Sequence, residues 1–306
     1  MSTIIVSDWP SFITAVGTSG ADVEFPKNLV KTADVDVNPD KLYVDSNGVV
    51  QSNVQPSDLA NLYENTFELN ADDVAEEGFT SPININCLSL NGFGGTIRNI
   101  YNTACDMFVI NNADFTMSNM AILDSNLKDD FMYASVTLND TSGCTKCIFS
   151  AMLVGDDDPI YFINDYHMFF RQCSFNLRLR DKALFLEPTY PYFNKLEYCR
   201  VEIDADNSGV NILPGINSYF TGTFPTQVHA TMPSNYTNVY CIYDIYCPSI
   251  LAGTWTSPVR TCVCNIDKCE GEHTYLLEAT TDEWEGAIGP LTDAAYLSSI
   301  GFPIET

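Results

Sequence analysis

The sequence predicts an all-β protein built as a single right-handed parallel β-helix, a solenoid in which each repeat forms one coil. Cys147, Cys173 and Cys199 follow one another at intervals of 26 residues. An alternating apolar and polar stretch, typical of a strand, follows each of these cysteines. Helical periodicity is almost absent here, and runs of Asn, Asp and Gly separate the strands. Short strands, regular turns and a period in the twenties are typical of a parallel β-helix.

The cysteine interval also predicts the register of the coils. Stepping back by 26 residues from Cys147 reaches Ala121 and then Gly95, so five small residues are expected at one position of five successive coils. Equivalent residues of adjacent coils stack about 4.8 Å apart. We therefore predict a ladder of inward, reduced cysteines in an interior too narrow for larger side chains. A second strand of each later coil is expected at 107–110, 133–138, 160–163 and 183–187.

Three segments are expected along the chain. Residues 1–82 form an N-terminal cap and an acidic irregular segment, with a short helix at 9–16 that starts after Ser7 or Asp8 and covers the open end of the coils. Residues 83–275 form the β-helix. After Cys199 the next similar context comes 42 residues later, at Cys241, which predicts an excursion at 205–238. Residues 276–306 form a closing tail with a short helical stretch.

Composition limits the partners. The 306 residues include 40 acidic and 14 basic side chains, a formal net charge of −26. Such a surface repels phosphate backbones, so neither nucleic acid nor an anionic membrane is expected as a partner. No apolar run has the length of a membrane-spanning helix, and the N-terminus does not read as a secretory signal peptide. The 11 cysteines, an odd number, predict reduced thiols in a protein made in a cytoplasm.

Two groups of residues are candidate chemical sites. By the 26-residue register, Asp130 projects onto Asp156, then near Asp181 and Asp206. Such a column could be solvated turns, a catalytic carboxylate pair or a Ca²⁺ site, and the turn interpretation is favoured because Asp is an ordinary turn residue. The second group offers four soft metal ligands, but its spacing differs from common zinc motifs and buried thiols are favoured. It consists of Cys262, Cys264, Cys269 and His273.

A basic cluster near the coils has two interpretations. Arg178 and Arg180 alternate with leucines, which places both on the outer face of a strand, near Arg171, Lys182 and Arg200. They could bind a substrate or pair with the acidic column, and ion pairing is favoured. No G-x-S-x-G motif occurs, and no nucleophile with its base is recognisable. The sequence therefore predicts no catalytic residue, no cofactor, no metal site and no enzyme.

Aromatic residues give the expected contact surface, since such side chains anchor interfaces and stack on sugars. Packing of these residues against the coils is the alternative. The candidates are Tyr190, Tyr192, Phe193, Tyr219, Phe220 and Phe224.

Three stretches carry a resemblance to a family. TIIVSDWPSFITAV, GFGGTIRNI and LTDAAYLSSIGFPI resemble the pectin-lyase-like β-helix proteins that bacteriophages encode. The resemblance implies a structural virion component, a head decoration or tail-associated protein, made in the bacterial cytoplasm and working on the particle. It implies other virion proteins as partners and leaves open a homo-oligomer and a bacterial surface glycan. The alternative is a tailspike-type enzyme that cleaves polysaccharide or a glycan-binding adhesin.

Overall fold

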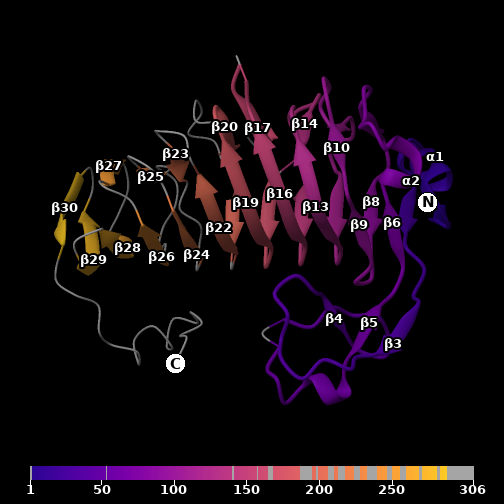
Figure 1. Ribbon diagram of the computed structural model, residues 1–306, viewed down its shortest axis with the longest axis horizontal. Helices are drawn as coiled ribbons and strands as arrows, with labels where there is room; N and C mark the ends of the chain where they lie inside the picture. Colours follow the sequence, from indigo (N-terminus) through magenta and orange to yellow (C-terminus); the bar gives the residue numbers. More distant parts are fainter. Residues whose placement is uncertain are drawn as a thin grey trace.

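The computed structural model describes residues 2–205, apart from 53, 140, 157, 165–167, 187–194 and 198. Beyond 205 it describes the backbone of the strands between 210 and 287. Most of the described chain is strand, arranged as a parallel β-solenoid of about five turns (Figure 1). The predicted fold class is confirmed, and the right hand of the solenoid stays a prediction. None of the described helices has the length and hydrophobicity needed to cross a bilayer.

Three parallel sheets, here called sheets I, II and III, form the faces of the solenoid. Sheet I consists of β1 (Thr3–Ile5), β2 (Asp22–Glu24), β8 (Ser89–Asn91), β12 (Thr116–Ser118), β15 (Gly143–Thr145), β18 (Phe169–Arg171) and β21 (Lys195–Glu197). Sheet II begins with β6 (Glu68–Asn70), β9 (Thr96–Arg98), β13 (Ala121–Leu127), β16 (Ile148–Val154), β19 (Ser174–Arg180) and β22 (Arg200–Ala205), and β10 (Tyr101–Asn102) pairs with β13. Sheet III consists of β7 (Ile83–Ile85), β11 (Phe108–Ile110), β14 (Met132–Ala134), β17 (Ile160–Asn164) and β20 (Ala183–Leu186).

The cysteine ladder is present, with one correction. Cys147, Cys173 and Cys199 are buried free thiols on three adjacent coils. The backbone N–H of the residue after each later cysteine donates to the carbonyl of the previous one, and Ile148 N–H donates to the carbonyl of Met120. Met120, not Ala121, therefore precedes Cys147 in the ladder, because this coil is slightly longer than the two that follow it. Ala121 pairs with Ile148 instead and faces away from the interior.

Aromatic rings fill the interior beside the thiols. Phe149 stacks on Phe175 with centroids 5.1 Å apart, and Phe131 stacks on Phe162 at 4.6 Å. All four side chains are about 1% exposed or less. These stacked side chains join neighbouring coils, which gives the solenoid a continuous packed core.

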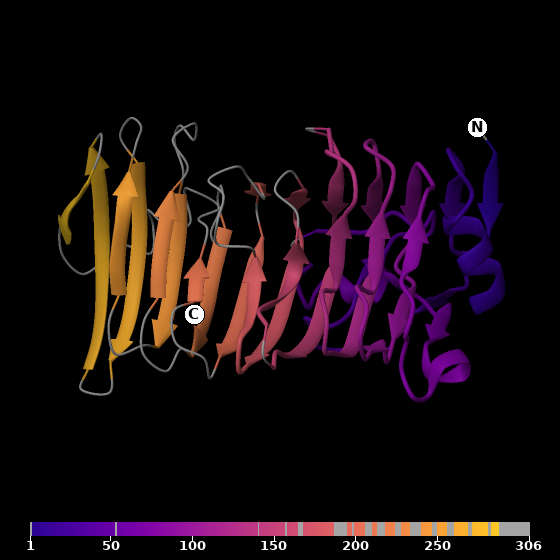
Figure 2. The ribbon, with the colours of Figure 1, turned by 90° about the horizontal axis from the view of Figure 1, so that it is seen from above.

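The N-terminal end is closed by α1 (Trp9–Val16), the helix expected at 9–16. Asp8 caps it, since its carboxylate accepts from Ser11 N–H while the Ser11 hydroxyl accepts from Asp8 N–H. The short helix α2 (Asp72–Ala75) lies at the same end of the stack of strands, and β29 and β30 lie at the other (Figure 2). β1, β2 and β6 extend sheets I and II, so the sheets begin within residues 1–82, which were expected to be irregular.

A small lobe, residues 27–66, interrupts the first coil (Figure 1). It contains β3 (Leu29–Lys31), β4 (Tyr43–Val44) and β5 (Tyr63–Asn65), paired antiparallel, and the turn η1 (Leu59–Asn61). Leu42 of this side lobe packs on Ala121, Leu123 and Ile148 of sheet II. The Lys146 ammonium donates to the carbonyl of Val50 at 2.8 Å. The side lobe therefore covers part of the outer face of sheet II.

The expected excursion at 205–238 is wrong for the residues described there. β24 (Ser218–Thr223) lies in sheet II between β22 and β26 (Tyr240–Tyr246). β23 (Val210–Ile212), β25 (Val228–Met232) and β27 (Ile250–Trp255) form a further parallel sheet. Ser218 pairs with Cys241, and Cys241 with Cys262 of β28 (Arg260–Lys268). The coils after Cys199 are shorter than the spacing of the earlier cysteines, so a whole coil was mistaken for a loop.

Antiparallel strands replace the parallel coils at the C-terminal end. β28 pairs antiparallel with β29 (Gly271–Thr280), which pairs with β30 (Glu283–Ala287). β29 crosses the boundary expected between residues 275 and 276. The helical stretch expected near the end of the tail lies outside the described residues.

Candidate functional site

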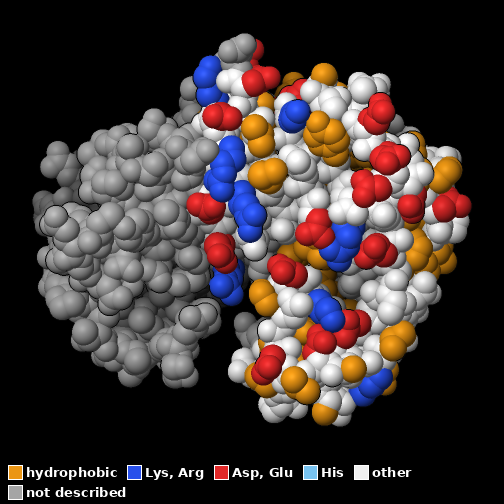
Figure 3. Space-filling view, in the orientation of Figure 1, with side chains coloured by type: hydrophobic (Ala, Val, Ile, Leu, Met, Phe, Trp, Pro, Cys, Tyr) orange, Lys and Arg blue, Asp and Glu red, His pale blue; other side chains and the backbone are white. Residues whose placement is uncertain are grey.

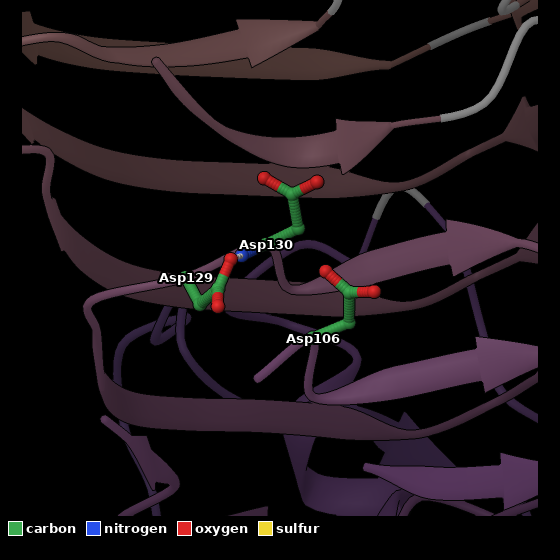
Figure 4. Close-up of side chains that lie close together, drawn as sticks. All are labelled: Asp106, Asp129 and Asp130. Carbon is green, nitrogen blue, oxygen red and sulfur yellow. Dashed lines mark hydrogen bonds between the residues drawn. The ribbon is translucent and has the colours of Figure 1, made fainter. Parts of the chain in front are cut away.

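Three aspartates meet at the corner that leads into sheet III (Figure 4). Asp106 precedes β11, and Asp129 and Asp130 precede β14 on the next coil. Phe108 pairs with Met132, so Asp106 and Asp130 occupy equivalent positions two residues before that pair. One carboxylate oxygen from each aspartate lies within 4.8 Å of the others. Parallel pairing of adjacent coils thus brings like charges together.

Asp130 is the most buried of the three, at 7% exposed. Its Oδ1 accepts from Tyr161 N–H at 2.6 Å, and its Oδ2 accepts from Asn164 Nδ2 at 2.7 Å. Its backbone carbonyl accepts from Met107 N–H at 2.8 Å. Asp130 therefore connects the preceding coil to the following one through both its backbone and its side chain.

Burial is the largest influence on the titration of this corner. It raises the pKa of Asp130 to about 6, against the lowering effect of the two hydrogen bonds, and Asp106 and Asp129 raise it further. Burial and the Asp129 carboxylate also raise the pKa of Asp106. The pKa of the nearby Cys105 thiol is raised by burial and by the same carboxylates. Asp130 can therefore hold or release a proton near pH 6.

A buried amide fixes the geometry of the corner. Asn102, which is fully buried, donates through Nδ2 to the carbonyls of Cys105 at 2.9 Å and Asp129 at 3.1 Å. Its Oδ1 accepts from Lys128 N–H at 2.8 Å. The backbone on either side of the carboxylates is held by this one side chain, so their separation does not depend on solvent-exposed contacts.

The chemistry open to this corner follows from its oxygens. A carboxyl that titrates near pH 6 beside an ionised partner can act as a general acid. Carboxylate oxygens at this spacing are also the ligands that Ca²⁺ prefers. Both Asp130 oxygens already accept hydrogen bonds, however, which favours a structural role for this residue.

The expected acidic column differs from the one observed. Met132 pairs with Ile163, so Asp130 aligns with Tyr161 and not with Asp156. Asp156 and Asp181 lie at the corner between sheets II and III, where they line an open hollow of about 530 Å³ with Lys128 and Lys182. Asp206 lies outside the described residues. The sequence prediction did not include Asp106. Asp106 lies two residues before β11, just as Asp130 lies two residues before β14.

Arg178 and Arg180 lie on β19 of sheet II and alternate with buried leucines, as expected, whereas Arg171 ends β18 of sheet I and Lys182 lies in the corner after β19. Arg178 is exposed while Leu177 and Leu179 are buried. Arg180 pairs with Asp204 at 2.7 Å, and Arg200 lies 3.8 Å from Glu202. Basic and acidic side chains alternate on this face over β19 and β22 (Figure 3). Arg180 and Arg200 therefore lie next to acidic residues of β22 itself, and not of the acidic column expected from the 26-residue register.

The predicted aromatic and metal candidates fall mostly beyond the described side chains. Tyr219 and Phe220 belong to β24, a strand of sheet II, and not to a loop. Cys262 and Cys264 lie in β28, and His273 in β29 pairs with Ile266. Outside the described residues are Tyr190, Tyr192, Phe193, Phe224 and Cys269.

Comparisons of the chain with protein-family models, with curated proteins and with solved structures give no match.

Proposed function

We propose that this protein is a structural component of a bacteriophage virion, a head decoration or tail-associated protein that works through protein–protein contacts. The observation that carries the proposal is the N-terminal end of the solenoid. Here Ile5, Ile13 and Val74 are 64%, 40% and 51% exposed, although the interior behind them is fully packed. Ile13 and Val74 line the same groove. Neighbouring apolar side chains left in solvent are typical of an interaction surface.

The resemblance found in the sequence supports the phage context. Its first stretch, TIIVSDWPSFITAV, comprises β1 and α1 at this same end. Its second, GFGGTIRNI, contains β9 and the corner before it. The stretches that carry the resemblance therefore include the exposed end.

The test is the location of the protein during infection. Particles are purified by density gradient from the host that carries the phage genome, washed in high salt, and quantified by mass spectrometry. A fixed copy number that survives the wash is expected. A coding sequence outside any phage genome, or protein found only in the soluble lysate, would contradict the proposal.

A second candidate, polysaccharide cleavage, is favoured by one observation. Asp130, with its pKa raised to about 6 by burial, lies beside Asp129 of its own coil and Asp106 of the preceding coil. Glycosidases use such a pair, one carboxyl protonated and one ionised. The occupied oxygens of Asp130 place this candidate second.

A further inference from the structure

An apolar groove of about 540 Å³ lies between α1 and the segment that contains α2. Its apolar lining consists of Trp9, Pro10, Ile13, Val74, Ala75 and Phe79. The groove lies at the end of the solenoid that exposes Ile13 and Val74, and both side chains belong to its lining.

The floor of the groove is rigid. Trp9 is 3% exposed, and its ring packs against Phe12 at 5.3 Å and Phe79 at 5.8 Å between centroids. Its indole N–H donates to the carbonyl of Asn70. Gly78 has a φ of 94°, and a Cβ there would lie 2.6 Å from the Tyr101 ring, so only glycine fits between α2 and Phe79. A preformed floor lowers the cost of ordering on binding.

Charge decides what kind of partner fits. Residues 1–26 and 67–98, which build this end, contain eight acidic residues and one basic residue, Arg98. Four of the acids, Asp72, Asp73, Glu76 and Glu77, are exposed on α2 and the turn after it. Among the described residues none of these four forms an ion pair, whereas Glu68 is paired with Arg98. Of these four, Glu77 lines the groove, and Glu76 precedes it in the chain, so the apolar floor carries negative charge at the edge formed by the turn after α2.

We propose that this groove binds an amphipathic segment of a partner protein, in which an aliphatic or aromatic side chain is flanked by Lys or Arg. The apolar side chain packs over Trp9 and Phe79, and the cations lie against Glu76 and Glu77. The inference rests on the proposed structural role and names the chemistry of the partner surface. An acidic segment is disfavoured because the acidic residues beside the groove would repel it. A purely apolar segment is disfavoured because it would remove water from these carboxylates without replacing the lost hydrogen bonds.

The first test uses the full chain and two labelled probe peptides, KLLKKLLKKLLK and its charge-reversed form ELLEELLEELLE, in fluorescence anisotropy. The lysine peptide should bind and weaken with added salt, and the glutamate peptide should not bind. The double variant Glu76→Gln/Glu77→Gln should weaken binding about five- to tenfold. Val74→Ser, at an exposed position that leaves the core intact, should weaken it several-fold.

The matched control is Asp36→Asn/Asp40→Asn, which removes the same charge from two exposed positions on the side lobe. It should bind as the wild type does. Equal loss in both double variants would show non-specific attraction to an acidic protein and overturn the inference. Circular dichroism melting establishes that each variant is folded.

The second test separates this inference from the proposed function. A photo-crosslinking amino acid replaces Ile13, and crosslinked products are identified from purified particles. A partner peptide rich in Lys or Arg supports both proposals. Protein present in particles without a crosslink at position 13 refutes the groove alone. Groove-dependent peptide binding by a protein missing from particles refutes the virion role alone.

Discussion

The free energy of unfolding of the wild-type protein should contain a component that falls as the pH rises from 4 to 7, because Asp130 is buried. Replacing Asp130 with asparagine should abolish this component. Burial raises the pKa of Asp130 from an ordinary value of 3.8 to about 6. Between these values the folded protein holds a proton that the unfolded chain releases. The folded state binds more protons in this window, so the free energy of unfolding falls as pH rises. The asparagine side chain does not titrate, and this component disappears.

The size follows from the shift. A change of about two pKa units corresponds to about 3 kcal/mol, reached in full above pH 6 and absent below pH 3.8. Asparagine has nearly the same shape, and its carbonyl can accept from Tyr161 N–H as Oδ1 of Asp130 does. The difference in unfolding free energy between variant and wild type should therefore increase by about 2 kcal/mol in favour of the variant from pH 4 to pH 7.

Urea unfolding of both proteins at pH 4, 5, 6 and 7 measures this difference, and other carboxylates cancel in the comparison. Asp8→Asn is the control, because it makes the same chemical change at a fully exposed helix cap. Hydrogen bonds from Ser11 lower the pKa of Asp8, so its contribution is lost only as the pH falls below about 4. Its difference from wild type should be nearly flat above pH 5. If the difference in unfolding free energy between Asp130→Asn and wild type does not change with pH, burial does not raise the pKa of Asp130 and the reasoning is refuted.

Three further outcomes are expected. Cys173→Phe should lower the free energy of unfolding by about 1–3 kcal/mol in chemical denaturation, because Cys173 is buried in the packed interior and the extra ring overpacks it. Iodoacetamide at pH 8 should label the half-buried Cys105 before Cys87, whose pKa burial raises to about 12; equal rates by peptide mass spectrometry would contradict the burial of Cys87. Host capsular and cell-wall polysaccharides should yield no new reducing ends or unsaturated uronates, and cleavage abolished by Asp130→Asn would promote the enzymatic candidate.

The ladder from Cys147 to Cys199 was predictable because those coils have equal length, and equal spacing in sequence then means equal position in space. A single extra residue between Met120 and Cys147 was enough to assign Ala121 to the wrong face. Met120 could not have been chosen by size, since a buried methionine fills the position that cysteines hold on later coils. The helix at 9–16 was predictable because its cap and its apolar face are local signals.

The acidic corner was not predictable from a fixed period. The stretch between β14 and β15 is longer than the equivalent stretch of the next coil, which moves Asp130 away from Asp156. Its neighbour Asp106 is visible only when strands are aligned by their own patterns, as Phe108 with Met132. The same error turned β24 into a loop, since the coil from Ser218 to Cys241 is shorter than the cysteine interval of the earlier coils.

From β12 onward the corner between sheets I and II keeps its length while the others vary, whereas four residues separate β8 from β9 on the earlier coil. The constant corner explains why cysteines mark the register of the later coils. Two residues separate β12 from β13, β15 from β16, and β18 from β19. The first of the two is Asn119, Lys146 or Gln172, each left-handed with φ between 53° and 56°. This sharp corner directs the second residue into the interior, where Cys147 and Cys173 are buried beside the turning backbone.

The stretches that lead from sheet II through sheet III to sheet I absorb the changes in coil length, from two residues between β19 and β20 to eight between β14 and β15. The acidic cluster lies on such a variable stretch, and the groove and side lobe lie in segments joined to the first coil. Substitutions at exposed positions of these segments should therefore alter contacts while the register of the coils is preserved.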